Sequence, residues 1–133
     1  MLETYPKEVK IVFKNFPLNK HKYARQAAQA ALAANEQGKF WDFHNRLFET
    51  YRFINNARIM QIARELNLDM AKFNQNLKSQ ALTERINRDL MEARSMGIRA
   101  IPSVFINGKL VRNRSFRGLK TMIEAELKKS KRY

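Results

Sequence analysis

Apolar and polar positions alternate near the beginning of the chain, and this alternation predicts a β-strand. Val9, Ile11 and Phe13 occupy every second position, with a lysine and a valine between them. The turn-forming run Asn15-Phe16-Pro17 follows directly. We therefore expect a strand over about residues 8–14.

Beyond this turn the apolar spacing changes to that of helices. A helix is expected from about Lys20 to Gln37, with seven alanines between Ala24 and Ala34, and Gly38 supplies its left-handed end. Asn55 or Asn56 can cap a later helix, and Asp69 another. The apolar stripes of the following helices are Phe40, Trp41, Phe43, Leu47, Phe48 and Tyr51; Ile59, Ile62, Ala63 and Leu66; Met70, Phe73 and Leu77; and Leu82, Ile86, Leu90 and Ala93. We interpret the aromatic stripe as core rather than as a ligand site.

After Gly97 the period returns to that of strands. Val104-Phe105-Ile106 and Leu110-Val111 flank Asn107-Gly108, and an Asn-Gly pair between apolar runs is the strongest local signal for a β-hairpin. Ser115 can cap a last helix. One strand, several helices, a hairpin and a final helix, with no repeat or linker, predict a single α/β domain over residues 1–133 with an α+β-like order of elements.

Composition limits the chemistry. The 133 residues are 44% hydrophobic, enough for a core, and contain no cysteine. This excludes a disulfide framework, a thiolate zinc site and a cysteine nucleophile within the chain. His21 and His44 lie on different predicted helices without a carboxylate pattern, so we expect no metal site, and no motif indicates a cofactor.

The chain is strongly basic, with a net charge of +14. Between Lys109 and Arg132, nine basic and two acidic residues give +7. Such a charge favours acidic proteins, anionic membranes or nucleic acid, although a solvated helix face is the simpler interpretation. No apolar run reaches the length of a membrane span, and residues 1–6 do not look like a secretion signal.

Several blocks together resemble the DsbA-like branch of the thioredoxin-fold family, over about Tyr5 to Leu127. They are Phe16-Pro17-Leu18 with His21, the alanine-rich helix, Gln37-Gly38-Lys39-Phe40-Trp41 with His44 and Leu47-Phe48, and the run from Ile101-Pro102-Ser103 to Asn107-Gly108. The resemblance implies a truncated thioredoxin-like fold with an inserted helical subdomain at about 20–97, a C-terminal β-hairpin and a final helix. The thioredoxin-like parts would then be about 7–19 and 98–129.

The same resemblance implies a protein disulfide oxidoreductase, whose relatives act outside the cytoplasm or in the periplasm. The family's Cys-x-x-Cys helix has no counterpart here, because residues 1–6 look like the end of that helix. No residue can therefore inherit the catalytic role, and we expect the chain to be redox-inactive. Pro102 matches the family's cis-proline, so the resemblance implies that Ile101 and Pro102 bind polypeptide substrates. Ile101 stands where the family often has threonine, and Val111–Arg114 where it commonly has glycine.

In thioredoxin-like folds the strand before the redox helix is central, between the counterparts of residues 8–14 and of the first hairpin strand. Its absence would leave two strand edges unpaired, and open edges recruit other chains. We expect a homodimer or a strand-swapped assembly. Two other functions stay open: a basic module that binds polyanions such as nucleic acid, and a chaperone-like domain that holds peptide around Ile101 and Pro102 without chemistry.

Overall fold

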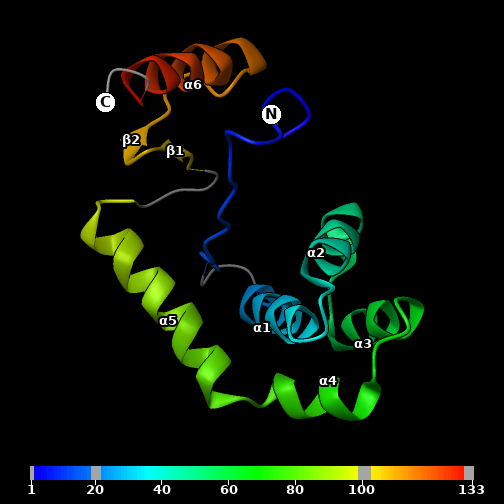
Figure 1. Ribbon diagram of the computed structural model, residues 1–133. Coiled ribbons are helices and arrows are strands. Elements are labelled where there is room, and N and C mark those ends of the chain that lie inside the picture. The colour runs from blue at the N-terminus through cyan, green and yellow to red at the C-terminus, as the bar shows by residue number, and fades with distance from the viewer. Residues whose placement is uncertain (1, 19–21, 99–102, 131–133) are drawn as a thin grey trace. The chain divides into compact units, whose positions relative to one another are not determined.

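The computed structural model describes residues 2–18, 22–98 and 103–130, which form six α-helices, a short 3-10 helix and a two-stranded sheet (Figure 1). The chain divides into two compact units, Lys14–Gly97, called the helical unit, and Met1–Phe13 with Ile98–Tyr133, called the hairpin unit. The elements are α1 (Ala24–Asn35), α2 (Phe40–Glu49), η1 (Tyr51–Phe53), α3 (Asn56–Glu65), α4 (Met70–Leu77), α5 (Gln80–Ser95), β1 (Phe105–Ile106), β2 (Lys109–Leu110) and α6 (Phe116–Ser130). The predicted order of helices, hairpin and final helix is confirmed.

Helix α1 lies at the centre of the helical unit and contacts α2, α3, α4 and α5. Residues Ala30 to Ala34 are all buried, which places one and a half turns of the helix inside protein on every side. Small side chains make this possible because they let four neighbouring helices approach the α1 backbone. The helix begins at Ala24, a turn later than expected, and Gly38 adopts the predicted left-handed conformation at φ +72°.

The helices of this unit begin at side-chain caps that the sequence indicates. The Asn55 side chain accepts a hydrogen bond from the Arg58 backbone N–H at 2.8 Å, and Asp69 accepts one from Lys72 at 3.1 Å. Both caps satisfy donors that the first turn of a helix leaves without a partner. Of the two cap candidates before α3, Asn55 is the one used.

The prediction that all the aromatic residues of α2 and its surroundings fill the core is wrong. Phe43 is fully buried, with its ring centroid 5.7 Å from that of Phe73, but Trp41 is 49% exposed and Phe48 64% exposed. The reason is angular. Residues 40, 43 and 47 lie on one face of the helix and residues 41, 44 and 48 lie on another. The sequence therefore contains two stripes on different faces where we expected one.

The strand predicted at about residues 8–14 is also wrong, since residues 9–18 form neither helix nor strand. The alternation of apolar and polar residues shows which side chains could face a core, whereas a strand also needs the backbone of a neighbouring strand for its hydrogen bonds. The end of this segment is held by side-chain contacts instead. The Asn15 backbone N–H and Nδ2 both donate to Asp89 Oδ2, each at 2.9 Å, and Lys14 lies 3.4 Å from Glu92.

The hairpin unit contains the predicted β-hairpin, in which Phe105 is opposite Leu110 and Ile106 opposite Lys109. Its two turn residues, 107 and 108, have φ angles of +47° and +80°, the conformation that an Asn-Gly pair favours. The Val111 backbone N–H donates to the Val104 carbonyl at 2.8 Å and extends the pairing by one residue. The hairpin is therefore the best-predicted part of the fold.

Helix α6 follows the hairpin and begins at the predicted cap. The Gly118 backbone N–H donates to Ser115 Oγ at 3.1 Å, and the Asn113 side chain accepts from the Ser115 backbone N–H at 3.1 Å. Ile123 is the one buried apolar residue of the helix among those described. Caps and turn together fix the path of the chain from β2 into α6.

Candidate functional site

The predicted substrate-binding residues, Ile101 and Pro102, lie outside the described residues, so their side chains and peptide bond stay predictions. The described chain resumes at Ser103, which is exposed, and enters β1 two residues later. The described part of the site therefore begins at Ser103 and continues into β1.

Strand β1 presents backbone groups on its outer side. In a hairpin with a two-residue turn, the pair that flanks the turn, Ile106 and Lys109, exchanges hydrogen bonds, and the next pair does not. The N–H and C=O of Phe105, which belongs to that next pair, therefore point away from β2. The Val104–Val111 bond that comes next fits this alternation. Within residues 103–130 and the other described ranges, no backbone group bonds to those of Phe105. This edge can accept an extended polypeptide.

A lysine and a glutamate connect β2 with α6. Lys109 Nζ lies 2.5 Å from Glu126 Oε1, and Lys129 lies 3.5 Å from the same oxygen. The hydrogen bond from Lys109 lowers the pKa of Glu126 below its ordinary value, and the bond to Glu126 raises the pKa of Lys109. The ion pair links β2 of the hairpin to helix α6.

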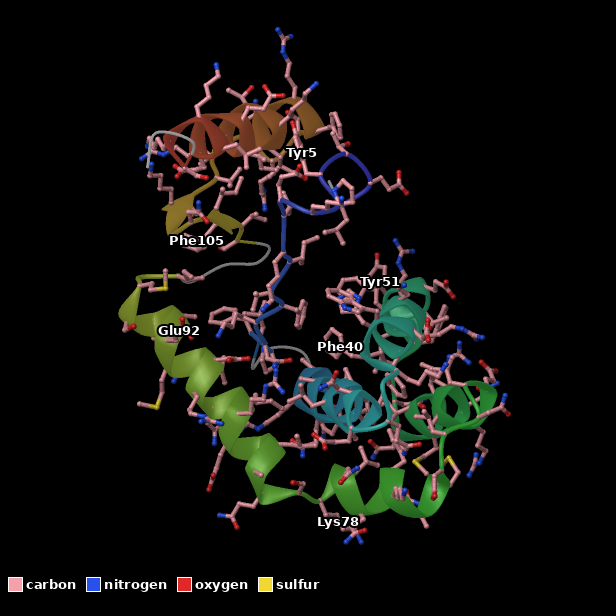
Figure 2. The ribbon with its side chains drawn as sticks, viewed as in Figure 1. Tyr5, Phe40, Tyr51, Lys78, Glu92 and Phe105 are labelled. Carbon is pink, nitrogen blue, oxygen red and sulfur yellow. The ribbon has the colours of Figure 1, made fainter. Side chains whose placement is uncertain are left out.

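A second contact joins the N-terminal segment to α6 (Figure 2). The Tyr5 hydroxyl donates to Glu124 Oε1 at 3.0 Å. Desolvation, followed by the hydrogen bond to this carboxylate, raises the pKa of Tyr5 above its ordinary value. Both glutamates of α6 are thus engaged by groups of the hairpin unit.

The described residues contain neither a group of metal ligands nor a helix that could span a membrane. Among them, no three His, Asp or Glu side chains are grouped so as to hold a metal ion. His21 lies outside the described ranges, and His44 lies between two aromatic rings, 5.7 Å from Phe40 and 4.5 Å from Phe48 between centroids. None of the helices described is long and apolar enough to cross a bilayer.

Sequence reasoning missed an aromatic surface on α2 and η1. Trp41, Phe48, Tyr51 and Phe53 are exposed there, from 49% to 76%. Figure 2 shows Tyr51 beside α2 in the helical unit. The signal that could have identified it is the second stripe at positions 41, 44 and 48, together with aromatic residues that continue past the end of α2.

Comparison with known proteins adds to this geometry. A family model described as Thioredoxin matches residues 2–125. The chain is 30% identical over 130 residues to a probable disulfide bond formation protein D of Bacillus anthracis, covering 92% of this chain and 59% of that protein. It is 34% identical over 102 residues to the Na(+)/H(+) antiporter NhaA 3 of Salinispora tropica, covering 76% of this chain and 16% of that protein. The chain thus spans about three fifths of the first relative and a small part of the second.

A solved structure shows the same fold. The thioredoxin-like oxidoreductase of Silicibacter pomeroyi DSS-3 aligns with a TM-score of 0.72 and 25% sequence identity, over 89% of this chain and 68% of that one. This similarity shows that the chain has a thioredoxin-like fold. Taken with the family match over residues 2–125, this shows that the chain belongs to the DsbA-like branch of the thioredoxin-fold family.

Proposed function

We propose that this chain is a polypeptide-binding domain of the disulfide-oxidoreductase type that does not itself exchange disulfides. Two observations carry the proposal: the family match over residues 2–125 and the absence of cysteine from all 133 residues. Disulfide exchange begins when a thiolate attacks a disulfide sulfur and forms a mixed disulfide. A chain without a sulfhydryl cannot form that bond.

The binding half of the proposal rests on Ile101, Pro102 and β1. By resemblance, the first two contact substrate polypeptide. The outward N–H and C=O of Phe105 lie three residues further along the chain, and an extended peptide can pair with them as an added strand. Because backbone groups provide this pairing, we expect the site to accept unfolded segments of varied sequence.

A titration followed by NMR tests the proposal. An unfolded, cysteine-free peptide added to the isotopically labelled 133-residue chain should shift the amides of Ser103 to Phe105. Ile101→Asp should weaken binding at least tenfold, since it places a charge against an apolar segment. Gln75→Asp, on exposed α4 surface, is the matched control.

Two results would contradict the proposal. Shift changes confined to the helical unit would place the peptide elsewhere. Reduction of insulin by the 133-residue chain would show that it exchanges disulfides, whereas we expect none above the rate with dithiothreitol alone.

We further propose that the outer edge of β1 pairs with a second copy when no peptide is present, giving a homodimer or a strand-swapped assembly. An exposed edge with unpaired backbone groups is a general route to such association. Light scattering at micromolar protein should give twice the monomer mass, and unfolded peptide should reduce it. A clean monomer at this concentration would contradict the intermolecular pairing.

A further inference from the structure

The segment around the start of α6 is the most uniformly basic part of the chain. From residue 93 to residue 123 there are seven lysines and arginines and no aspartate or glutamate. Four of these cations, Arg112, Arg114, Arg117 and Lys120, fall within nine consecutive residues and are all exposed. We call these four residues the basic corner.

Backbone packing holds the basic corner together. A β-carbon on Gly118 would lie 2.2 Å from the Asn113 carbonyl oxygen, so the loop before α6 lies directly against the first turn of the helix. The two hydrogen bonds of Ser115, one through its hydroxyl and one through its backbone N–H, fix this arrangement. The loop that carries Arg112 and Arg114 is therefore held against the start of α6, where Arg117 and Lys120 share one helix face at a spacing of three.

Three cations of the basic corner, Arg112, Arg117 and Lys120, are open to a ligand. No carboxylate in the described part of the chain pairs with Arg112, Arg117 or Lys120. The glutamates of α6 are occupied elsewhere, Glu126 by two lysines and Glu124 by Tyr5. The local field around these three cations is thus positive.

An exposed aromatic ring accompanies these cations. Phe116 is 58% exposed and lies between Arg114 and Arg117 in the sequence. Phosphate groups bind such cations, and nucleobases stack on exposed aromatic rings. We propose that the basic corner binds single-stranded nucleic acid, with phosphates on Arg112, Arg117 and Lys120 and a base stacked on Phe116.

The structure favours a nucleic acid over an anionic membrane as the partner. A helix that lies on a membrane offers its apolar face to lipid. In α6 that face is used within the protein, since Ile123 is buried and Leu119, Met122 and Leu127 are partly buried. The inference goes beyond the proposed function, because it concerns residues other than Ile101, Pro102 and β1.

Fluorescence anisotropy with a labelled 12-nucleotide oligo-dT tests the proposal on the full 133-residue chain. Arg112→Gln with Arg117→Gln should weaken binding and reduce the slope of log K against log salt by about 1.4, from about 0.7 for each phosphate contact. Arg85→Gln with Arg88→Gln, two exposed arginines of α5, removes the same charge elsewhere and should leave the slope unchanged.

Phe116→Leu separates stacking from charge. It should weaken binding about fivefold or more without a change in the salt slope. Equal losses in the α5 control, tighter binding to a blunt duplex than to oligo-dT, or binding to phosphatidylglycerol vesicles alone would each overturn the proposal. None of these outcomes depends on whether unfolded peptide binds at β1.

Discussion

The contact between Asn15 and Asp89 gives the most precise test of how the helical unit is held together. Asp89 Oδ2 accepts two hydrogen bonds, from the Asn15 backbone N–H and from its Nδ2, each at 2.9 Å. Both residues are buried, at 4% and 8% exposure. We predict that Asp89→Ala destabilises the unit much more than Asp89→Asn does.

The magnitudes follow from counting donors. Asp89→Ala leaves two buried donors without an acceptor, at about 1 to 3 kcal/mol each, so the expected loss is about 2 to 6 kcal/mol. Asp89→Asn keeps an oxygen at the same place and loses only the charge, at about 1 kcal/mol. Asn15→Ala removes one of the two bonds and should lie between them. The expected order is therefore Asp89→Ala, then Asn15→Ala, then Asp89→Asn.

Urea unfolding measures these losses directly. Trp41 is the only tryptophan of the chain and lies in the helical unit, so its fluorescence reports this unit. With a slope of about 2 kcal/mol per molar urea, a loss of 3 kcal/mol lowers the midpoint by about 1.5 M. Glu84→Ala removes an exposed carboxylate from the same helix and is the matched control.

The reasoning fails if Asp89→Ala costs no more than Glu84→Ala. It also fails if the double variant of Asn15 and Asp89 loses the full sum of the two single losses. Two groups that bond to each other should show a coupling of about 0.5 to 3 kcal/mol.

Three further predictions concern other elements. Gly118→Ala should destabilise the hairpin unit by about 1 to 3 kcal/mol, measured by hydrogen exchange, because the added methyl group meets the Asn113 carbonyl oxygen at 2.2 Å; a loss no greater than at an exposed alanine would refute this. Lys109 lowers the pKa of Glu126 in the folded state, so the ion pair stabilises the hairpin unit fully above the ordinary carboxyl pKa and loses this effect as the pH falls through the lowered pKa of Glu126. Glu126→Gln should therefore flatten the acid dependence of stability in NMR-monitored unfolding, and an unchanged profile would contradict the prediction. Asn55→Ala should cost the helical unit about 1 kcal/mol in urea unfolding, with recovery by Asn55→Ser; equal stability of all three proteins would exclude a capping role.

Local signals predict the parts of the fold that depend on neighbours in sequence. The Asn107-Gly108 turn and the caps Asn55, Asp69 and Ser115 follow from the chemistry of a few adjacent residues, and all four are confirmed. Each cap accepts a hydrogen bond from a backbone N–H three residues later, and the turn rests on the positive φ angles that Asn and Gly tolerate. Such features need no knowledge of the rest of the molecule.

The errors come from interactions between distant segments. Residues 8–14 have the alternation of a strand, but pairing depends on a second backbone, which alternation does not supply. The hydrophobicity of Trp41 and Phe48 predicts core positions, but the packing of the other helices leaves both side chains about half exposed or more. Ile101 and Pro102 lie outside the described residues and stay predictions.

The alanine-rich centre of the helical unit has a consequence for evolution. Since Ala30, Ala33 and Ala34 are completely enclosed, an added methylene at any of them would push against several surrounding helices at once. Random mutagenesis with selection for folded protein should therefore recover glycine or serine at these three positions and almost nothing larger. Variation among descendants of this chain is expected to accumulate on the outer helices, while α1 changes slowest.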